Sequence, residues 1–206
     1  MAYRIDKTLP IDDPFEILGG EGVIENHLRV TIPASGDERT YFLQIAEAAI
    51  RHTADVTGRN PVRATYRVHV PGIPLRVELP FRAASISAVG YLKEGATAYT
   101  SLNRDDFGIF GETAPSVLFS RDSISEPTDR DDDHPFPFRF TIVGLEDRER
   151  TDDDPVVDQV PKVFVHAALL YMSHLYENRQ AVAFGGKPYE IPLAFDRLVK
   201  SLFRFR

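Results

Sequence analysis

The stretch VFVHAALLYMSHLY, Val163–Tyr176, decides the fold. Its apolar spacing predicts a helix that opens at Pro161 and continues to about Ala181. Apolar side chains cover most of the circumference of this helix. A helix that is apolar nearly all round must be covered on nearly all sides. The polar residues fall on one narrow stripe, made of Lys162, His166, Ser173 and Glu177.

Two explanations account for so much apolar surface, and the pattern alone leaves both open. The helix is either the central helix of a monomeric core, or it is covered in part by a neighbouring copy of the same protein. Its polar end, Tyr176–Arg179, poses the same choice. These residues either cap the helix within the chain or bond a neighbouring subunit.

Three further helices are predicted along the chain. A short one ends near His27–Val30, and Pro192 opens a last one with an apolar stripe. Between them, Ser35 and Glu38 form a capping-box pattern for a longer helix that Gly58 and Pro61 stop. The stripe of this longer helix contains Phe42, Ile45, Ala46, Ala49, Thr53 and Val56.

The middle of the chain, residues 62–145, alternates polar and apolar residues with the period of β-strands. Pro71-Gly72 predicts a hairpin between residues 63–70 and 73–79, and Lys93-Glu94-Gly95 predicts a second hairpin between 86–92 and 96–102. Strand patterns also occur in FGIF, SVLFS and FRFTIVGL. The fold class is therefore α+β: a small helical bundle of about four helices, with an antiparallel β-rich extension inserted between the second and third helices.

Other segments lack periodicity. Residues 1–13 are expected to form a loose N-terminal arm, because Pro10 interrupts them and Pro14 follows. The first acidic segment, 122–135, and the second acidic segment, 146–155, are expected to be solvated or mobile loops. The whole chain, residues 1–206, is expected to form one domain, because its length is typical of a single domain.

Composition limits the function. The chain has 24 Lys and Arg against 31 Asp and Glu, a formal net charge of −7, which argues against broad binding to DNA or to anionic membranes. It contains no cysteine, so disulfides and thiolate metal sites are excluded. The longest apolar run, Val163–Met172, is far shorter than the roughly 18 residues of a membrane span, so no membrane contact is expected.

Motifs for catalysis, metals and cofactors are absent from the sequence. The six histidines show no metalloprotease spacing, and no nucleophile elbow or complete phosphate loop occurs. Asp129, Asp131 and Asp133 match the first, third and fifth positions of a calcium loop. The required glycine is replaced by His134 and the required glutamate by Phe140. We therefore predict no enzyme, no catalytic residue, no metal ligand and no cofactor.

The order of these signals resembles a known family. HLRV precedes an Ala-rich helix, FLQIAEAAIRHTADVTGRN, followed by TYRVHV, IPLRVELPFRAASISAVGYLKEG, FRFTIVGL and VPKVFVHAALLYMSHLYENRQAV. This order is similar to that of the head–tail connector proteins of tailed phages, also called head completion or adaptor proteins, which have relatives in gene transfer agents. The similarity runs from about Val23 to Arg206, and is most specific over His27–Val30, Ala46–Asn60 and Leu170–Val182. Both acidic segments and the long arm depart from the family.

The resemblance implies a structural virion protein at the head–tail interface, made in the host cytoplasm during assembly. It implies a homo-oligomeric ring, expected to be dodecameric, that joins the portal protein of the capsid vertex to a stopper or tail-completion protein. Genomic DNA passes through the lumen without sequence-specific binding. Such a ring catalyses no reaction.

Site residues follow from this resemblance and from the apolar patterns. The C-terminal segment 189–206 is predicted to bind the portal, with Gly185 and Gly186 as its hinge; alternatively, its phenylalanines fold back onto their own core. The predicted portal-binding residues are Phe195, Leu198, Val199, Leu202, Phe203, Arg204, Phe205 and Arg206. The predicted subunit-interface residues are Phe42, Ile45, Ala49, Phe164, Ala168, Tyr171, Tyr176, Glu177 and Arg179.

Two other functions compete with the ring. One is a calcium- or carbohydrate-binding β-rich module that uses the acidic segments. The other is a hydrolase with a carboxylate pair that the sequence does not reveal, since spacing cannot show which carboxylates converge.

Overall fold

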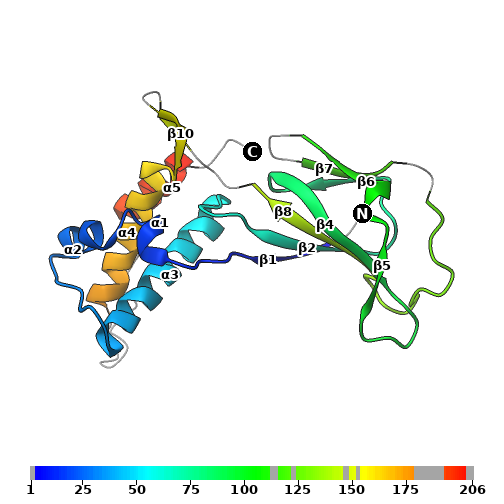
Figure 1. Cartoon of the computed structure of the whole chain (residues 1–206), viewed down its shortest axis with the longest axis horizontal. Helices are drawn as coiled ribbons and strands as arrows, with labels where there is room; N and C mark the ends of the chain where they lie inside the picture. Colours follow the sequence, from blue (N-terminus) through cyan, green and yellow to red (C-terminus); the bar gives the residue numbers. More distant parts are fainter. Residues whose placement is uncertain are drawn as a thin grey trace. The chain divides into compact units, whose positions relative to one another are not determined.

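A computed structural model describes residues 3–111, 116–121, 124–145, 149–151, 154–178 and 193–202 (Figure 1). The chain forms two compact units, each built from two stretches of sequence. We call Met1–Pro10 with Val62–Glu146 the β unit, and Ile11–Pro61 with Asp147–Arg206 the helical unit. The single domain expected over residues 1–206 is therefore organised as two units.

The helical unit contains five helices in its described part, where about four were predicted, and it does not form a clear four-helix bundle. The additional helix is the four-residue α1, which opens where Asp13 accepts hydrogen bonds from the backbone N–H groups of Phe15 (2.9 Å) and Glu16 (3.2 Å). The helices are α1 (Pro14–Ile17), α2 (Glu21–Leu28), α3 (Asp37–Thr57), α4 (Lys162–Glu177) and α5 (Leu193–Leu202).

The start of α3 differs from the prediction. Gly36 is its N-cap residue and no side chain caps it, so the capping box of Ser35 and Glu38 is not formed. Glycine takes this position because its φ of 95° lies in the region that other residues rarely adopt. The helix ends, as predicted, at Gly58, whose φ of 68° is left-handed.

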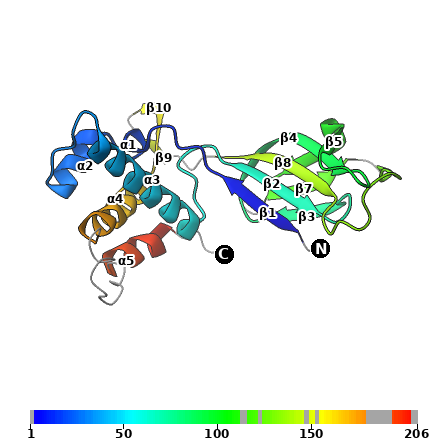
Figure 2. The same cartoon turned by 90° about the horizontal axis from the view of Figure 1, so that it is seen from below.

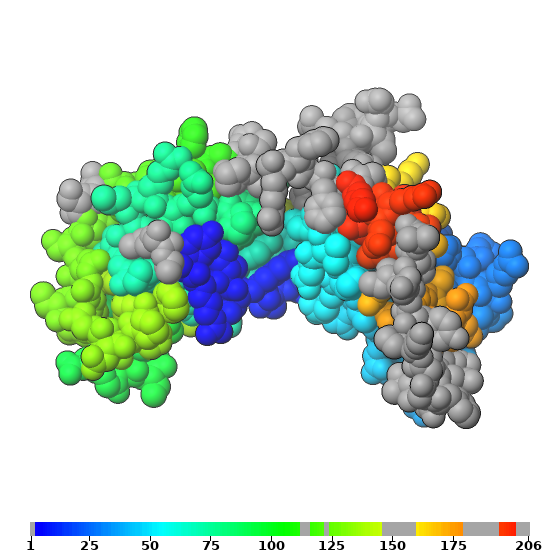
Figure 3. All heavy atoms as spheres, turned by 180° about the vertical axis from the view of Figure 1, so that it is seen from behind, coloured from blue at the N-terminus to red at the C-terminus, as the bar shows by residue number. Residues whose placement is uncertain are grey.

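Helix α4 is covered by helices of its own chain. It packs against α2, α3 and α5 (Figure 2), and in Figure 3 the atoms of α5, in red, lie against those of α3, in cyan. Five α4 side chains are buried: Phe164, Ala167, Ala168, Leu169 and Met172. For these five buried side chains, the explanation that applies is burial in the core of their own chain. None of the described helices is both long and apolar enough to cross a bilayer.

The β unit contains two antiparallel sheets. A five-stranded sheet has the order β1-β2-β8-β4-β5 and a three-stranded sheet the order β3-β7-β6. A 3-10 turn, Arg104–Asp106, precedes β6. The strands are β1 (Arg4–Thr8), β2 (Thr65–Val70), β3 (Arg76–Leu79), β4 (Ala83–Leu92), β5 (Tyr99–Leu102), β6 (Phe107–Phe110), β7 (Ser116–Ser120) and β8 (Phe138–Gly144).

One predicted hairpin forms and the other does not. Strands β4 and β5 pair antiparallel with Leu92 opposite Tyr99, as Lys93-Glu94-Gly95 predicted. Strands β2 and β3 lie in different sheets, so the hairpin at Pro71-Gly72 is wrong. The reason is that both edges of β2 are occupied, one by β1 and the other by β8, while β3 pairs with β7.

Two segments expected to be irregular are strands. Within the arm predicted at residues 1–13, Arg4–Thr8 forms β1 along β2, because five consecutive residues find backbone partners there. In the second acidic segment, β9 (Glu149–Thr151) pairs antiparallel with β10 (Asp154–Gln159), which begins in that segment and continues beyond it. Strands pair through backbone hydrogen bonds, which acidic side chains do not prevent. The acidic composition therefore did not exclude a strand here.

The β unit has its core between the two sheets. Alternate residues of β8 are buried, and the ring of Phe140 meets Phe107 of the other sheet edge to face, with ring centroids 4.9 Å apart. Near the end of β8, Tyr66 stacks on Phe81 with ring centroids 3.6 Å apart. Gly144 leaves room for the Tyr66 ring, since a Cβ at Gly144 would lie 2.5 Å from Tyr66 Cε2.

We therefore expect Gly144→Ala to destabilise the β unit by about 1–3 kcal/mol, the usual cost of overpacking a filled core. Hydrogen exchange of the backbone amides of β2 and β8, measured at increasing urea concentrations, gives the change in the free energy of unfolding. Gly22→Ala is the control: it adds a Cβ inside α2 with nothing within 4 Å, and should stabilise that helix by up to about 1 kcal/mol. Equal stability of Gly144→Ala and the parent protein would contradict the close packing of Tyr66.

Candidate interaction surfaces

The predicted interface residues divide by burial. Tyr171 and Tyr176 are half-buried and Glu177 is exposed, so an interface role stays a prediction for them. Arg179, predicted with them, lies outside the described residues. The other five are covered by their own chain and are not carried into an interface proposal: Phe42, Ile45, Ala49, Phe164 and Ala168.

The polar end of α4 makes contacts within the chain. Asn178 Nδ2 donates a hydrogen bond to the His174 carbonyl oxygen at 2.8 Å and closes the last turn. Tyr176 stacks on Phe42 of α3, with ring centroids 5.4 Å apart. Of the two roles that the sequence left open for this end, the intrachain cap therefore describes Asn178.

Helix α5 uses its apolar stripe to pack on the helical unit. Phe195 and Val199 are buried and Leu198 is half-buried. The Phe195 ring lies 5.4 Å from Tyr171, and this contact agrees with the alternative in which Phe195 folds onto its own core. The other predicted residues of this segment have no described side chain or lie outside the described residues: Leu202, Phe203, Arg204, Phe205, Arg206, Gly185 and Gly186.

A histidine lies beneath α5. The His52 ring stacks on Tyr171 with centroids 4.1 Å apart, and lies 5.6 Å from Phe195. Its buried Nε2 has no hydrogen-bond partner within the part of the chain that the structure describes. Burial lowers the pKa of His52, while the Asp55 carboxylate acts in the opposite direction. The neutral ring is therefore the form that suits this packing.

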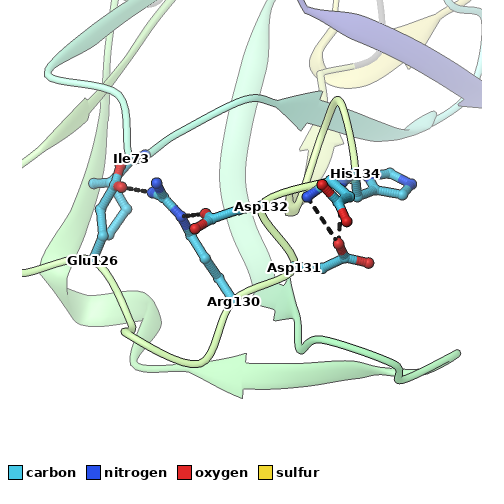
Figure 4. Close-up of polar contacts among 7 residues, drawn as sticks. Ile73, Glu126, Arg130, Asp131, Asp132 and His134 are labelled. Atoms are coloured by element: carbon cyan, nitrogen blue, oxygen red, sulfur yellow. Dashed lines mark hydrogen bonds and ion pairs between the residues drawn. The ribbon is translucent and has the colours of Figure 1, made fainter.

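The first acidic segment is held by contacts of its own (Figure 4). Arg130 bonds both Glu126 and Asp132, the latter with Nε–Oδ1 at 2.5 Å. Glu126 Oε1 also accepts from the Ile73 backbone N–H at 2.9 Å. Asp131 Oδ1 accepts from the backbone N–H groups of Asp133 and His134, both at 3.1 Å. The described part of this segment is thus an irregular, largely exposed loop, as expected, and hydrogen bonds and ion pairs of its own hold it.

Asp129 fixes the same segment to the β4–β5 hairpin. Its carboxylate accepts from Tyr91 Oη at 2.9 Å and pairs with Lys93 Nζ at 2.9 Å. The hydrogen bond from Lys93 is the main reason that the pKa of Asp129 is lowered. In residues 124–135 and the rest of the described chain, no three acidic or histidine side chains converge as metal ligands would. The calcium alternative therefore has no geometric support here.

A basic surface was not found by sequence reasoning. Arg4, His69 and Arg139 lie side by side across β1, β2 and β8, and Arg67 lies opposite Asp6 one row away. These residues belong to three segments up to 135 positions apart, so only the strand register unites them. We call Arg4, Arg67 and Arg139 the cationic face.

Exposed large apolar side chains lie in both units. Leu75 is 82% exposed and Phe110 74% exposed in the β unit, while Val23 and Val56 are 42% and 37% exposed in the helical unit. Among the described residues, the most exposed large apolar side chains therefore lie beside β3 and at the end of β6, where the sequence patterns did not indicate an interface.

We expect acid to loosen the packing around His52. Because its pKa in the folded chain is lowered, the unfolded chain takes up a proton first, and stability falls as the pH falls below about 6.5. Burial also lowers the pKa values of His27 and His69, which act in the same direction. Urea titrations of the whole chain at pH 7.5 and pH 5 measure the loss.

His52→Phe should reduce this pH dependence while keeping the stack on Tyr171, and Asp55→Asn should enlarge it by removing the opposing carboxylate. A pH dependence unchanged in His52→Phe would show that His52 does not carry it.

Comparison with known proteins gives a similarity of fold. No protein-family model and no curated protein matches the chain. A chain from the neck of an empty gene transfer agent particle, computed with C6 symmetry, is similar over 98% of this chain and 96% of that chain, with a TM-score of 0.63 and 14% sequence identity. A chain from the virion of a native gene transfer agent particle is similar over the same shares, with a TM-score of 0.62 and 14% identity. At this identity, what these chains share with ours is the fold.

Proposed function

We propose that this chain is a structural component of the neck of a phage-like or gene transfer agent particle. Its role is that of an adaptor ring between the portal vertex and the tail. The observation that supports this most is the similarity in fold to a neck chain over 98% of the length, because it includes both units and not one common module. The order of sequence signals points independently to the same class of protein.

The proposed ring is built from copies of this chain. The similar neck chain was computed with C6 symmetry, so we propose a copy number that is a multiple of six, with twelve as the expected value. A closed ring needs a heterologous interface, in which one face of a subunit meets a different face of the next. The net charge of −7 suits a channel for DNA, because like charges repel and limit adhesion.

Contacts with neighbouring virion proteins are proposed as follows. The portal contacts the outer side of α5, where Arg197 and Lys200 are exposed and Leu198 is half-buried, together with the terminal residues 203–206. Phe195 and Val199 hold α5 on the helical unit. A stopper or tail-completion protein binds the opposite side of the ring. No reaction is part of this function.

Deletion of the gene tests the proposal. We expect DNA-filled heads without tails, because the neck cannot be completed, and tails should return when the chain is supplied from a plasmid. Electron microscopy of purified particles scores the heads, and antibody labelling should place the chain at the head–tail junction. Tailed particles formed normally without the chain, or purified particles that lack it, would refute the assignment.

A further inference from the structure

The cationic face concentrates positive charge on an acidic protein. Register places Arg4, His69 and Arg139 in one row on the outer side of the five-stranded sheet, and Arg67 in the next row beside Asp6. Three guanidinium groups and one carboxylate leave a local charge of +2 (3 − 1), against −7 for the whole chain. Arg4 and Arg67 are exposed to solvent.

The face is held in place by contacts across four strands. The Arg139 guanidinium lies over the Tyr99 ring, 4.0 Å from its centroid. Tyr99 Oη lies 3.4 Å from His69 Nδ1, and Arg4 Nε bonds Asp6 Oδ1 at 3.0 Å. Opposite Arg139 stands Gly90, where a Cβ would lie 3.0 Å from the Thr100 carbonyl oxygen. These contacts order Arg4 and Arg139 before any partner arrives.

The first acidic segment offers the opposite charge within the same unit. Residues 124–135 contain five carboxylates and one arginine, a local charge of −4 (1 − 5). Asp132 is 76% exposed and Asp133 is exposed, so much of this charge faces solvent. The segment crosses the end of β4, where the Asp131 N–H bonds the Leu92 carbonyl oxygen at 2.9 Å.

We propose that the cationic face binds the first acidic segment of the next copy in the ring, and that this contact joins the copies head to tail. The inference rests on the proposed function, since it requires a ring. Guanidinium and carboxylate groups form strong, directional pairs. One chain carries both halves as separate sets of residues, so that each copy could offer one half to each neighbour, as a heterologous interface requires.

A second copy suits this face better than nucleic acid does. Proteins that hold a duplex by its backbone make roughly 6–10 phosphate contacts, and three arginines on a chain of charge −7 fall well short of that. The first acidic segment also has the bonded, ordered form that a defined protein contact needs.

Charge reversal in the deletion strain tests the contact. Arg4→Glu with Arg67→Glu is expected to lower the amount of the chain in purified particles by at least about tenfold, because it sets like charges against each other. Asp132→Lys with Asp133→Lys should have the same effect. All four changes in one chain should restore incorporation, since every contact then has reversed but complementary charges. Arg67→Lys, which keeps the charge, is the matched control and should be incorporated far better than the charge-reversed pair.

The remaining outcomes separate the inference from the proposed function. Failure of the fourfold variant to recover, with its circular dichroism unchanged, overturns the contact, as does normal incorporation of either reversed pair. Loss of packaged DNA with normal incorporation in Arg4→Glu/Arg67→Glu overturns it in favour of a nucleic-acid contact. Absence of the parent chain from particles overturns the proposed function and this inference together.

Discussion

Helix α4 has apolar side chains around most of its circumference, and the structure depends on how the chain covers them. A helix with so few polar positions gains stability only when other elements exclude water from it. Helices α2, α3 and α5 pack against it from positions before and after it in the sequence, and five of its side chains are buried. The helical unit is therefore organised around α4, and the side chains available to partners are those that this packing leaves outside.

The same packing brings polar groups into an apolar setting. His52 packs against both Tyr171 and Phe195, where it contributes a flat surface for stacking but leaves Nε2 without a hydrogen bond from the described residues. The rings of His27 and His166 meet edge to face, with centroids 6.1 Å apart. The pKa of His27 is lowered mainly by burial and further by the nearby His166. The stability of the helical unit is therefore expected to depend on pH through these histidines.

Helices and most strands could be predicted from the sequence because their periodicity is local. The long helix α3 and the β4–β5 hairpin are examples, with clear stop signals at Gly58 and Gly95. The pairing of strands was harder to predict from the sequence. Strands β1 and β8 both pair with β2, but no residue pattern in either strand indicates that partner. Apolar stripes also could not distinguish an interface from a core, and for Phe42, Phe164 and Phe195 the structure shows a core. The cationic face depends wholly on register and so was beyond the reach of sequence patterns.

The chain passes between its units at residues 10–11, 61–62 and 146–147, so neither unit is a continuous piece of sequence. A fragment cut to residues 62–146 would lack β1 and would leave the backbone of β2 without its outer neighbour. Bare strand edges of this kind recruit other chains and promote aggregation. Cutting the gene into contiguous pieces is thus a poor route to either half. A circular permutant that rejoins Arg4–Thr8 to the rest of the sheet would be the natural way to make the β unit alone.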